Sequence, residues 1–224
     1  MSGRLLTVDG LDGSGKATQT ELLCEALNQR GIQLRRVSFP DYSSMSSAPV
    51  RMYLDGEFGS RPEEVNAYAA SSFFAVDRFA SYVRDWRKDY LEGTLIVADR
   101  YTTSNMIYQL PKLSKKDWDG FLQWLQDFEY EKLRLPRPDL TVYLEMPTEI
   151  SQRLLDKRYQ NGGKRDIHES NLGYLAACRE SAAYAAGHLG WRTIACEEGQ
   201  RLRKRKEIHE ELLKLVLEEF HVKI

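Results

Sequence analysis

Short apolar runs recur along the chain and are separated by longer, more polar stretches. Five runs have the length and the β-branched content of buried strands, and they cover residues 4–9, 34–39, 94–99, 140–145 and 191–196. The stretches between them are long enough for helices. Alternation of strands and helices is typical of a parallel sheet wrapped by helices. The pattern therefore predicts an α/β fold.

Four of the intervening segments have apolar residues at intervals of three and four, which is the spacing of amphipathic helices. They cover residues 17–31, 64–93, 115–133 and 169–190. Gly31, Gly93 and Gly190 end three of these segments, as expected for glycines that terminate helices. Residues 157–166, KRYQNGGKRD, have instead the clustered charge and central glycines of a surface loop.

Length and composition narrow the possible functions. A chain of 224 residues suffices for one α/β domain, and we predict a single domain over residues 1–224. The net charge of -1 provides no overall basic field for nucleic acid or a membrane surface. Cys24, Cys178 and Cys196 have neither metal-site nor disulfide-framework spacing. We expect a cytoplasmic protein with reduced thiols and no nucleic-acid or membrane partner.

A glycine-rich stretch follows the first predicted strand and precedes the first predicted helix. It consists of Gly10, Leu11, Asp12, Gly13, Ser14, Gly15, Lys16, Ala17 and Thr18. Its glycines allow successive backbone N–H groups to converge on one anion, and Lys16 adds a charge that can reach the outer phosphates. A purely structural turn is the alternative. The strand, the glycine spacing, the lysine and the helix together favour a loop that binds the phosphates of a nucleotide.

Ala17 departs from the usual form of such a loop, in which a Ser or Thr hydroxyl after the lysine ligates magnesium. Thr18 has a hydroxyl, but successive helix positions differ by about 100° in direction. Two hypotheses follow. Either magnesium is held mainly by phosphate oxygens, water and carboxylates, or the loop binds nucleotide without efficient turnover.

An acidic and a basic residue end the third predicted strand. Asp99 and Arg100 lie at the carboxyl end of a buried parallel strand, where such sheets bind their ligands. Asp99 can hold magnesium through water or orient an acceptor phosphate. Arg100 can clamp phosphate oxygens with two parallel hydrogen bonds. An ion pair at the surface is the alternative interpretation.

The chain resembles the thymidylate kinase family over almost its whole length. The resemblance rests on the loop GLDGSGK and on FPDY, YLDGEFG, FFAVDR, DRYTTSN, RPDLTVYLEMP and DIHE, in that order. It implies a P-loop NTPase-type five-stranded parallel sheet flanked by helices on both faces, with a lid loop. It also implies transfer of the γ-phosphoryl group of ATP to dTMP with Mg²⁺, in a homodimer.

The resemblance further implies a dTMP site, formed by Asp12, Phe39, Pro40, Tyr42, Phe74, Arg78, Arg100, Ser104, Asn105, Tyr108, Asp166 and Glu169. Phe74 would stack on the base, and Arg78 and Asn105 would bind its polar edge. Tyr108 would exclude a ribose 2′-hydroxyl. Taken singly, Phe74 and Tyr108 could be core aromatics and Asn105 a helix cap. Asp41 stands where many relatives have an arginine, so binding of the acceptor phosphate would depend more on Arg100, Tyr42 and Arg78.

A lid at about residues 158–168 would complete the donor site. Relatives place an arginine either in the phosphate loop, where this chain has Gly13, or in the lid, where Arg158, Lys164 and Arg165 are available. A solvated charge run is the alternative for this loop. The predicted catalytic residues are Lys16, Asp99, Arg100, Arg158 and Arg165; Arg153 would pack on adenine, and Asp99 and Asp12 would hold the metal.

Two other functions remain compatible with these residues. The first is a P-loop kinase that acts on a different nucleoside monophosphate or on a deoxynucleoside. The second is a nucleotide-binding module without turnover, which Ala17 and Asp41 suggest.

Overall fold

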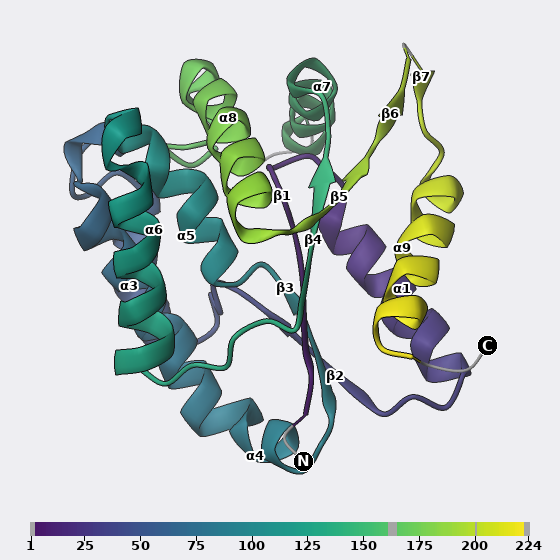
Figure 1. Cartoon of the computed structure of the whole chain (residues 1–224). Coiled ribbons are helices and arrows are strands. Elements are labelled where there is room, and N and C mark those ends of the chain that lie inside the picture. The colour runs from purple at the N-terminus through teal and green to yellow at the C-terminus, as the bar shows by residue number, and fades with distance from the viewer. Residues whose placement is uncertain (1–2, 161–164, 200, 222–224) are drawn as a thin grey trace.

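The centre of the molecule is a sheet of five parallel strands in the order β2-β3-β1-β4-β5 (Figure 1). The computed structural model describes residues 3–160, 165–199 and 201–221. The strands are β1 (Leu5–Gly10), β2 (Leu34–Ser38), β3 (Leu95–Asp99), β4 (Leu140–Glu145) and β5 (Arg192–Ala195). Each lies within, or extends by one residue beyond, one of the predicted apolar runs. The α/β fold with a five-stranded parallel sheet is thereby confirmed.

Helices connect the strands. They are α1 (Lys16–Gln29), α2 (Ala48–Leu54), α3 (Ala67–Ser81), α4 (Arg87–Leu91), α5 (Thr102–Gln109), α6 (Trp118–Gln126), α7 (Thr148–Tyr159), α8 (Leu172–Leu189) and α9 (Arg205–Glu219). Two π-helical turns cover Tyr82–Trp86 and Asp127–Lys132, and 3₁₀ turns cover Met45–Ser47, Pro62–Glu64, Leu110–Lys112 and Lys115–Asp117. A short antiparallel hairpin, β6 (Glu197–Glu198) with β7 (Arg201–Leu202), follows the last strand of the sheet.

The sheet is covered on both faces, as Figure 1 shows, with α1 and α9 on one side and α3, α5, α6 and α8 on the other. Val8, Leu27 and Leu212 belong to the apolar core under α1 and α9. Tyr143 and Cys178 belong to a core on the opposite face, under α5 and α8. Because both faces of β1, β3 and β4 are covered, these strands consist largely of apolar residues rather than alternating ones.

The prediction of one continuous helix over residues 64–93 is wrong, because the segment contains two α-helices. The segment begins with a 3₁₀ turn, and α3 starts at Ala67 behind Asn66, whose side chain accepts a hydrogen bond from the Ala69 N–H. A π-helical turn then separates α3 from α4. Apolar residues continue through that turn, with Tyr82 and Trp86 both buried. Hydrophobic spacing therefore gives no sign of the change in hydrogen bonding.

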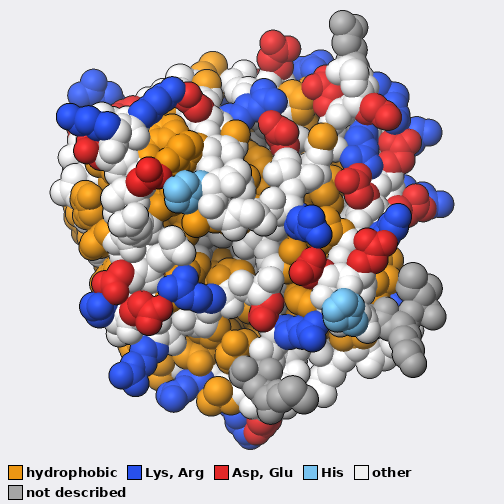
Figure 2. All heavy atoms as spheres, in the orientation of Figure 1, with side chains coloured by type: hydrophobic (Ala, Val, Ile, Leu, Met, Phe, Trp, Pro, Cys, Tyr) orange, Lys and Arg blue, Asp and Glu red, His pale blue; other side chains and the backbone are white. Residues whose placement is uncertain are grey.

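The distribution of charged side chains and the hydropathy of the helices can be compared with the predictions from composition. Figure 2 shows acidic and basic side chains interspersed over the face seen in Figure 1. Within the described residues, no helix is both long and apolar enough to cross a membrane. Cys24, Cys178 and Cys196 are buried and free.

Candidate functional site

A cavity of about 520 Å³ opens at the carboxyl ends of β1 and β3. This is the edge at which parallel α/β sheets bind their ligands. Most of the predicted site residues line it, namely Asp12, Lys16, Ala17, Phe39, Pro40, Tyr42, Phe74, Arg78, Asp99, Arg100, Ser104, Asn105, Tyr108, Asp166 and Glu169. Predicted residues from five separate segments of the chain thus meet at one site.

The predicted phosphate loop joins the end of β1 to the start of α1. Gly13 and Gly15 have φ angles of 80° and 81°, which side-chain-bearing residues rarely adopt. A Cβ atom at Gly13 would lie 2.4 Å from the carbonyl oxygen of Ser151 on α7. A residue with a side chain, arginine included, therefore does not fit at this position in this conformation. Lys16 is buried at the first position of α1.

Charges of both signs are concentrated where the loop meets β3. Asp12 forms ion pairs with Arg100 and with Lys16, whose Nζ is 3.3 Å from Asp12 Oδ1, and its Oδ2 accepts a 2.7 Å hydrogen bond from the Tyr108 hydroxyl. Burial alone would raise the pKa of Asp12, but Arg100 and Lys16 hold it well below its ordinary value. Burial and the charge of Arg100 lower the pKa of Lys16. An incoming phosphate would meet two cations that already share one carboxylate.

Asp9, on β1, is a residue that the sequence analysis missed. It is fully buried and accepts hydrogen bonds from the hydroxyls of Thr103, at 2.6 Å, and Ser104, at 2.8 Å. The Gly10 N–H donates to its other oxygen, which also lies 3.7 Å from Arg100 Nη1. Asp9 therefore ties the start of α5 to the phosphate loop. The only signal in the sequence was a charged residue inside an otherwise apolar strand.

Carboxylates would have to provide the protein ligands of a magnesium ion at this site, because Ala17 has no hydroxyl. Within the described ranges, no group of three or more His, Cys, Asp or Glu side chains is arranged to hold a metal ion. Mg²⁺ commonly takes only one or two carboxylates together with substrate phosphates, and Asp99 fits this requirement because its nearest ion-pair contact, to Arg36, is 3.7 Å long. Asp12 is already engaged by two cations. Ala17 lines the cavity and Thr18 does not, as the helix geometry predicts.

Phe74, Arg78 and Asn105, which the resemblance assigns to the base of the acceptor, lie together in the cavity lining; this part is called the base end below. Arg78 is fully buried and forms a two-pronged ion pair with Glu129, with hydrogen bonds of 2.7 and 2.6 Å. The side-chain amide of Asn105 donates to Glu129 and to the Ser71 carbonyl, both at 3.1 Å. The sequence analysis missed Glu129, which no motif marks.

Tyr108 forms part of the cavity wall between the phosphate loop and the base end. The His168 ring stacks on it, with ring centroids 5.2 Å apart and planes 12° from parallel. The Tyr53 hydroxyl accepts a hydrogen bond from Lys112 at 2.8 Å and shares a second hydrogen bond, of 2.7 Å, with His168 Nε2. Burial lowers the pKa of His168 to about 3, so the ring is neutral. His168 was also missed.

The FPDY segment borders the cavity beside α2. Tyr42 is exposed, and the Asp41 side chain accepts from the Ser43 hydroxyl at 2.6 Å and does not line the cavity. Arg51, on α2, does line it, and its Nη1 donates to the carbonyls of Tyr42 and Ser44 at 3.0 Å. Arg51 was not predicted. It supplies a cation on the side of the cavity that the FPDY segment borders, where Asp41 does not line the cavity.

The lid residues are only partly brought to the site. Asp166 and Glu169 line the cavity, and the Tyr159 hydroxyl donates to Glu169 at 2.6 Å. Arg165 forms an ion pair with Asp156 on α7 and does not line the cavity. Arg153 is exposed and also lies outside it. The Arg158 side chain and Lys164 lie outside the described residues.

Asp166 is expected to make stability depend on pH. Burial, and then the negative charge of Asp12, raises the pKa of Asp166 to about 7 from 3.8. Between these pH values the unfolded chain has lost the proton that the folded protein keeps, so the free energy of unfolding falls as pH rises. Asp166→Asn removes this loss and keeps an oxygen for the backbone N–H groups of His168 and Glu169.

The measurement is the thermal midpoint of both proteins at pH 5 and pH 8. The variant is expected to gain stability relative to the parent at pH 8 and to match it more closely at pH 5. Parallel pH profiles would show that Asp166 titrates normally.

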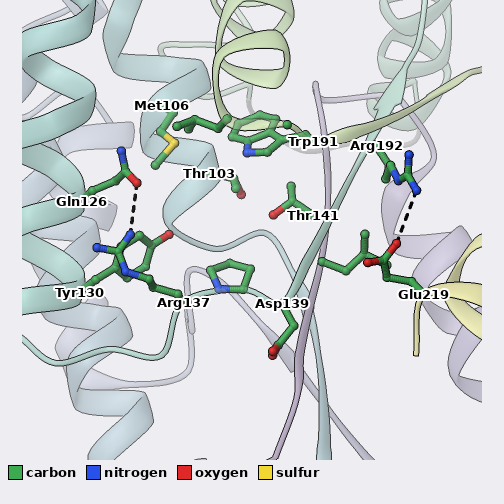
Figure 3. Close-up of a pocket in the computed structure, with 14 residues that line it drawn as sticks. Thr103, Met106, Gln126, Tyr130, Arg137, Asp139, Thr141, Trp191, Arg192 and Glu219 are labelled. Carbon is green, nitrogen blue, oxygen red and sulfur yellow. Dashed lines mark hydrogen bonds and ion pairs between the residues drawn. The ribbon is translucent and has the colours of Figure 1, made fainter. Parts of the chain in front are cut away.

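A second cavity, of about 410 Å³, lies at the opposite edge of the sheet (Figure 3). Asp139 and Leu140, at the start of β4, and Arg192, at the start of β5, line it. Its charged groups are already paired: Arg192 lies 3.5 Å from Glu219, and Arg137 donates to Gln126 at 3.2 Å. Its described lining does not include Lys16 or Arg100. The first cavity is therefore the candidate active site.

Comparison of the chain with known proteins points repeatedly to the same family. The family model described as "Thymidylate kinase" matches residues 8–215. A thymidylate kinase of Mycobacterium tuberculosis is 30% identical over 186 residues, which are 81% of this chain and 84% of that protein. A thymidylate kinase of Rhodopirellula baltica is 27% identical over 85% of this chain and 72% of its own length. A probable thymidylate kinase of Methanothermobacter thermautotrophicus is 28% identical over 88% of each chain.

Proposed function

Because the chain belongs to the thymidylate kinase family, we propose that it transfers the γ-phosphoryl group of ATP to dTMP, yielding ADP and dTDP. One observation carries this proposal. Lys16 of the phosphate loop and Arg100 at the end of β3 both contact the carboxylate of Asp12. A donor phosphate held by the loop and an acceptor phosphate held by Arg100 would therefore meet at one point.

Phosphoryl transfer asks the protein mainly to position two substrates and to place positive charge around the moving group. In the proposed mechanism, the backbone N–H groups of residues 10–18 and the Lys16 ammonium bind the phosphates of ATP. Arg100 orients the dTMP phosphate for in-line attack. Mg²⁺ bound to the ATP phosphates would neutralise charge that develops on them, and Asp99 is the carboxylate placed to hold it, with Asp12 as the second candidate.

The lid is proposed to supply the remaining cations. A lid that closes over the phosphates excludes water and completes the charge distribution. The contact between Arg165 and Asp156 would break on closure, which frees Arg165 for the transferred group; Arg158 is the second candidate. Arg153 is proposed to pack on adenine. The close approach of Gly13 to Ser151 supports this role of the lid, because the loop itself has no room for an arginine.

We further propose that residues 1–224 form one domain and that two copies associate in the cytoplasm. Val76, Phe79 and Val83 are exposed by 52, 41 and 45% and recur at intervals of three and four along α3 and the following turn. Residues at this spacing lie on one face of a helix. A second copy packed against this apolar face would remove it from water. Light scattering of the purified protein would measure the mass of the assembly.

The central test is ADP release in a coupled assay with a panel of nucleoside monophosphates and deoxynucleosides. We expect turnover with dTMP and little with thymidine, because Arg100 needs a phosphate to bind. Turnover with another acceptor but not with dTMP would indicate a P-loop kinase that acts on a different nucleoside monophosphate or on a deoxynucleoside. ATP binding without ADP release in the presence of dTMP would indicate a nucleotide-binding module.

Tyr108 is proposed to exclude ribonucleotides through the bulk of its ring. Tyr108→Phe keeps the ring and its stacking on His168, so discrimination between dTMP and its ribose counterpart should persist. Tyr108→Ala removes the ring and should relax discrimination by about 1–3 kcal/mol. The measurement is kcat/KM for both nucleotides in both variants, with thermal melting as a control for folding. Equal behaviour of the two variants would exclude Tyr108 as the sugar gate.

A further inference from the structure

Glu129 lies directly behind the base end of the candidate active site. It belongs to the π-helical turn Asp127–Lys132, a type of turn that is rare and frequent at functional sites. It is fully buried, and its carboxylate accepts from Arg78 Nε at 2.7 Å, from Arg78 Nη2 at 2.6 Å and from Asn105 Nδ2 at 3.1 Å. Arg78 and Asn105 line the cavity and Glu129 does not. The carboxylate can thus act on a bound base only through these two residues.

The contacts of Glu129 fix the orientation of the Asn105 amide. Asn105 Nδ2 has two hydrogens, and it donates to Glu129 and to the Ser71 carbonyl. Both partners are acceptors only. Turning the amide over would place its oxygen against two other oxygens. The amide nitrogen is therefore committed to the protein, and Oδ1 is the polar atom that Asn105 can offer to the cavity.

The same carboxylate fixes the Arg78 guanidinium. Nε and Nη2 are held by Glu129, whereas Nη1 makes a single long contact of 3.4 Å with the Tyr101 carbonyl. The N–H groups of Nη1, and the Nη2 hydrogen that points away from Glu129, are thus the donors that Arg78 has available for a ligand. The base end of the cavity consequently presents an acceptor on Asn105 and only donors on Arg78.

We propose that Glu129 is a positioning residue that sets the base selectivity of the acceptor site, by holding Asn105 as an acceptor and Arg78 as a donor. This inference rests on the proposed function. Thymine and uracil present an N–H next to a carbonyl, which matches this pair. Cytosine presents a bare ring nitrogen next to an amino group, so that acceptor would face acceptor and donor would face donor.

Glu129→Gln tests the role of the carboxylate with the smallest change in shape. A glutamine has one oxygen and one NH₂ group, so the NH₂ must face either Arg78 Nε or the pair formed by Arg78 Nη2 and Asn105 Nδ2. The first arrangement displaces Arg78, and the second turns the Asn105 amide over. Either one breaks the acceptor and donor pattern.

The measurement is kcat and KM for dTMP and dCMP in the parent protein and in Glu129→Gln. We expect the ratio of kcat/KM for dTMP to that for dCMP to fall at least roughly tenfold. The loss should appear as a higher KM for dTMP with kcat within about threefold, because contacts to the base are made equally before and during transfer. Glu131→Gln is the matched control, since it removes a charge from the same turn at an exposed pair with Arg137.

A variant that folds and keeps the full preference for dTMP over dCMP would overturn the proposal. If Glu129→Gln does not fold, the test is turnover by the parent protein of dUMP and of dTMP methylated at N3. Turnover of dUMP and rejection of the N3-methylated nucleotide would support an acceptor at Asn105; equal use of the methylated nucleotide would overturn it. Failure of the parent protein to phosphorylate dTMP would instead refute the proposed function itself.

Discussion

Lys16→Ala is expected to lower kcat by roughly 10³-fold or more while leaving the protein folded. The reason is that the Lys16 ammonium is the fixed cation at the first turn of α1, where negative charge from the transferred group would accumulate. It lines the cavity and forms an ion pair with Asp12 at 3.3 Å. Its loss should weaken ATP binding less than it slows transfer, since the charge that it opposes grows during the reaction.

The measurement combines steady-state ADP release with ATP affinity and thermal melting. Lys206→Ala is a suitable control, because Lys206 is exposed and its ion pair, to Glu210 at 3.7 Å, lies on the surface of α9. A Lys16→Ala protein with near-normal kcat would refute the assignment of residues 10–18 to phosphate binding. A parallel loss in Lys206→Ala would point to a general effect of removing charge.

The centre of the sheet could be predicted from the sequence because β1, β3 and β4 are buried on both faces. Such strands read as continuous apolar runs, and a run such as LTVYLE needs no knowledge of its neighbours to be recognised. The conformation of the glycine-rich loop could be predicted for a similar reason. That conformation depends on local glycine spacing, and Gly13 and Gly15 indeed adopt positive φ angles.

Residues that act through long-range contacts could not be predicted in this way. Glu129 meets Arg78 across 51 positions and His168 meets Tyr53 across 115 positions of the chain. Neither pair has any local pattern, and a glutamate in a polar helical segment is usually solvated. The buried position of Glu129 follows only from the packing of the π-helical turn against α3 and α5.

The partners of the charged residues in the predicted lid could not be predicted from the sequence either. Sequence composition predicted a charged loop over residues 157–166, but residues 157–159 are the last turn of α7, and residues 161–164 lie outside the described part of the chain. Composition also does not specify which charge pairs with which. The structure places Arg165 against Asp156, and brings Asp166 beside the cavity with a raised pKa. Partner choice among surface charges depends on side-chain geometry and on small energies, and it varies with conformation.

Arg100→Met is expected to abolish most activity and also to destabilise the protein. The Arg100 guanidinium pairs with Asp12 and lies 3.7 Å from the buried Asp9, so its removal leaves carboxylates without compensation. Breaking one partner out of a buried ion pair costs about 3–5 kcal/mol of folding free energy. If Arg100 also orients the acceptor phosphate, kcat/KM for dTMP should fall by roughly 10³-fold.

A double variant separates the two effects. Adding Asp12→Asn to Arg100→Met removes one of the uncompensated charges, so the thermal midpoint should recover towards that of Asp12→Asn alone. Activity should not recover, because the acceptor phosphate still has no guanidinium to bind. Recovery of kcat/KM to the level of Asp12→Asn would mean that Arg100 serves only as the structural partner of Asp12. Arg100 would then have a structural role in an ion pair, which is the alternative interpretation of this residue. Arg51 would become the leading candidate for binding the acceptor phosphate, since it lines the FPDY side of the cavity.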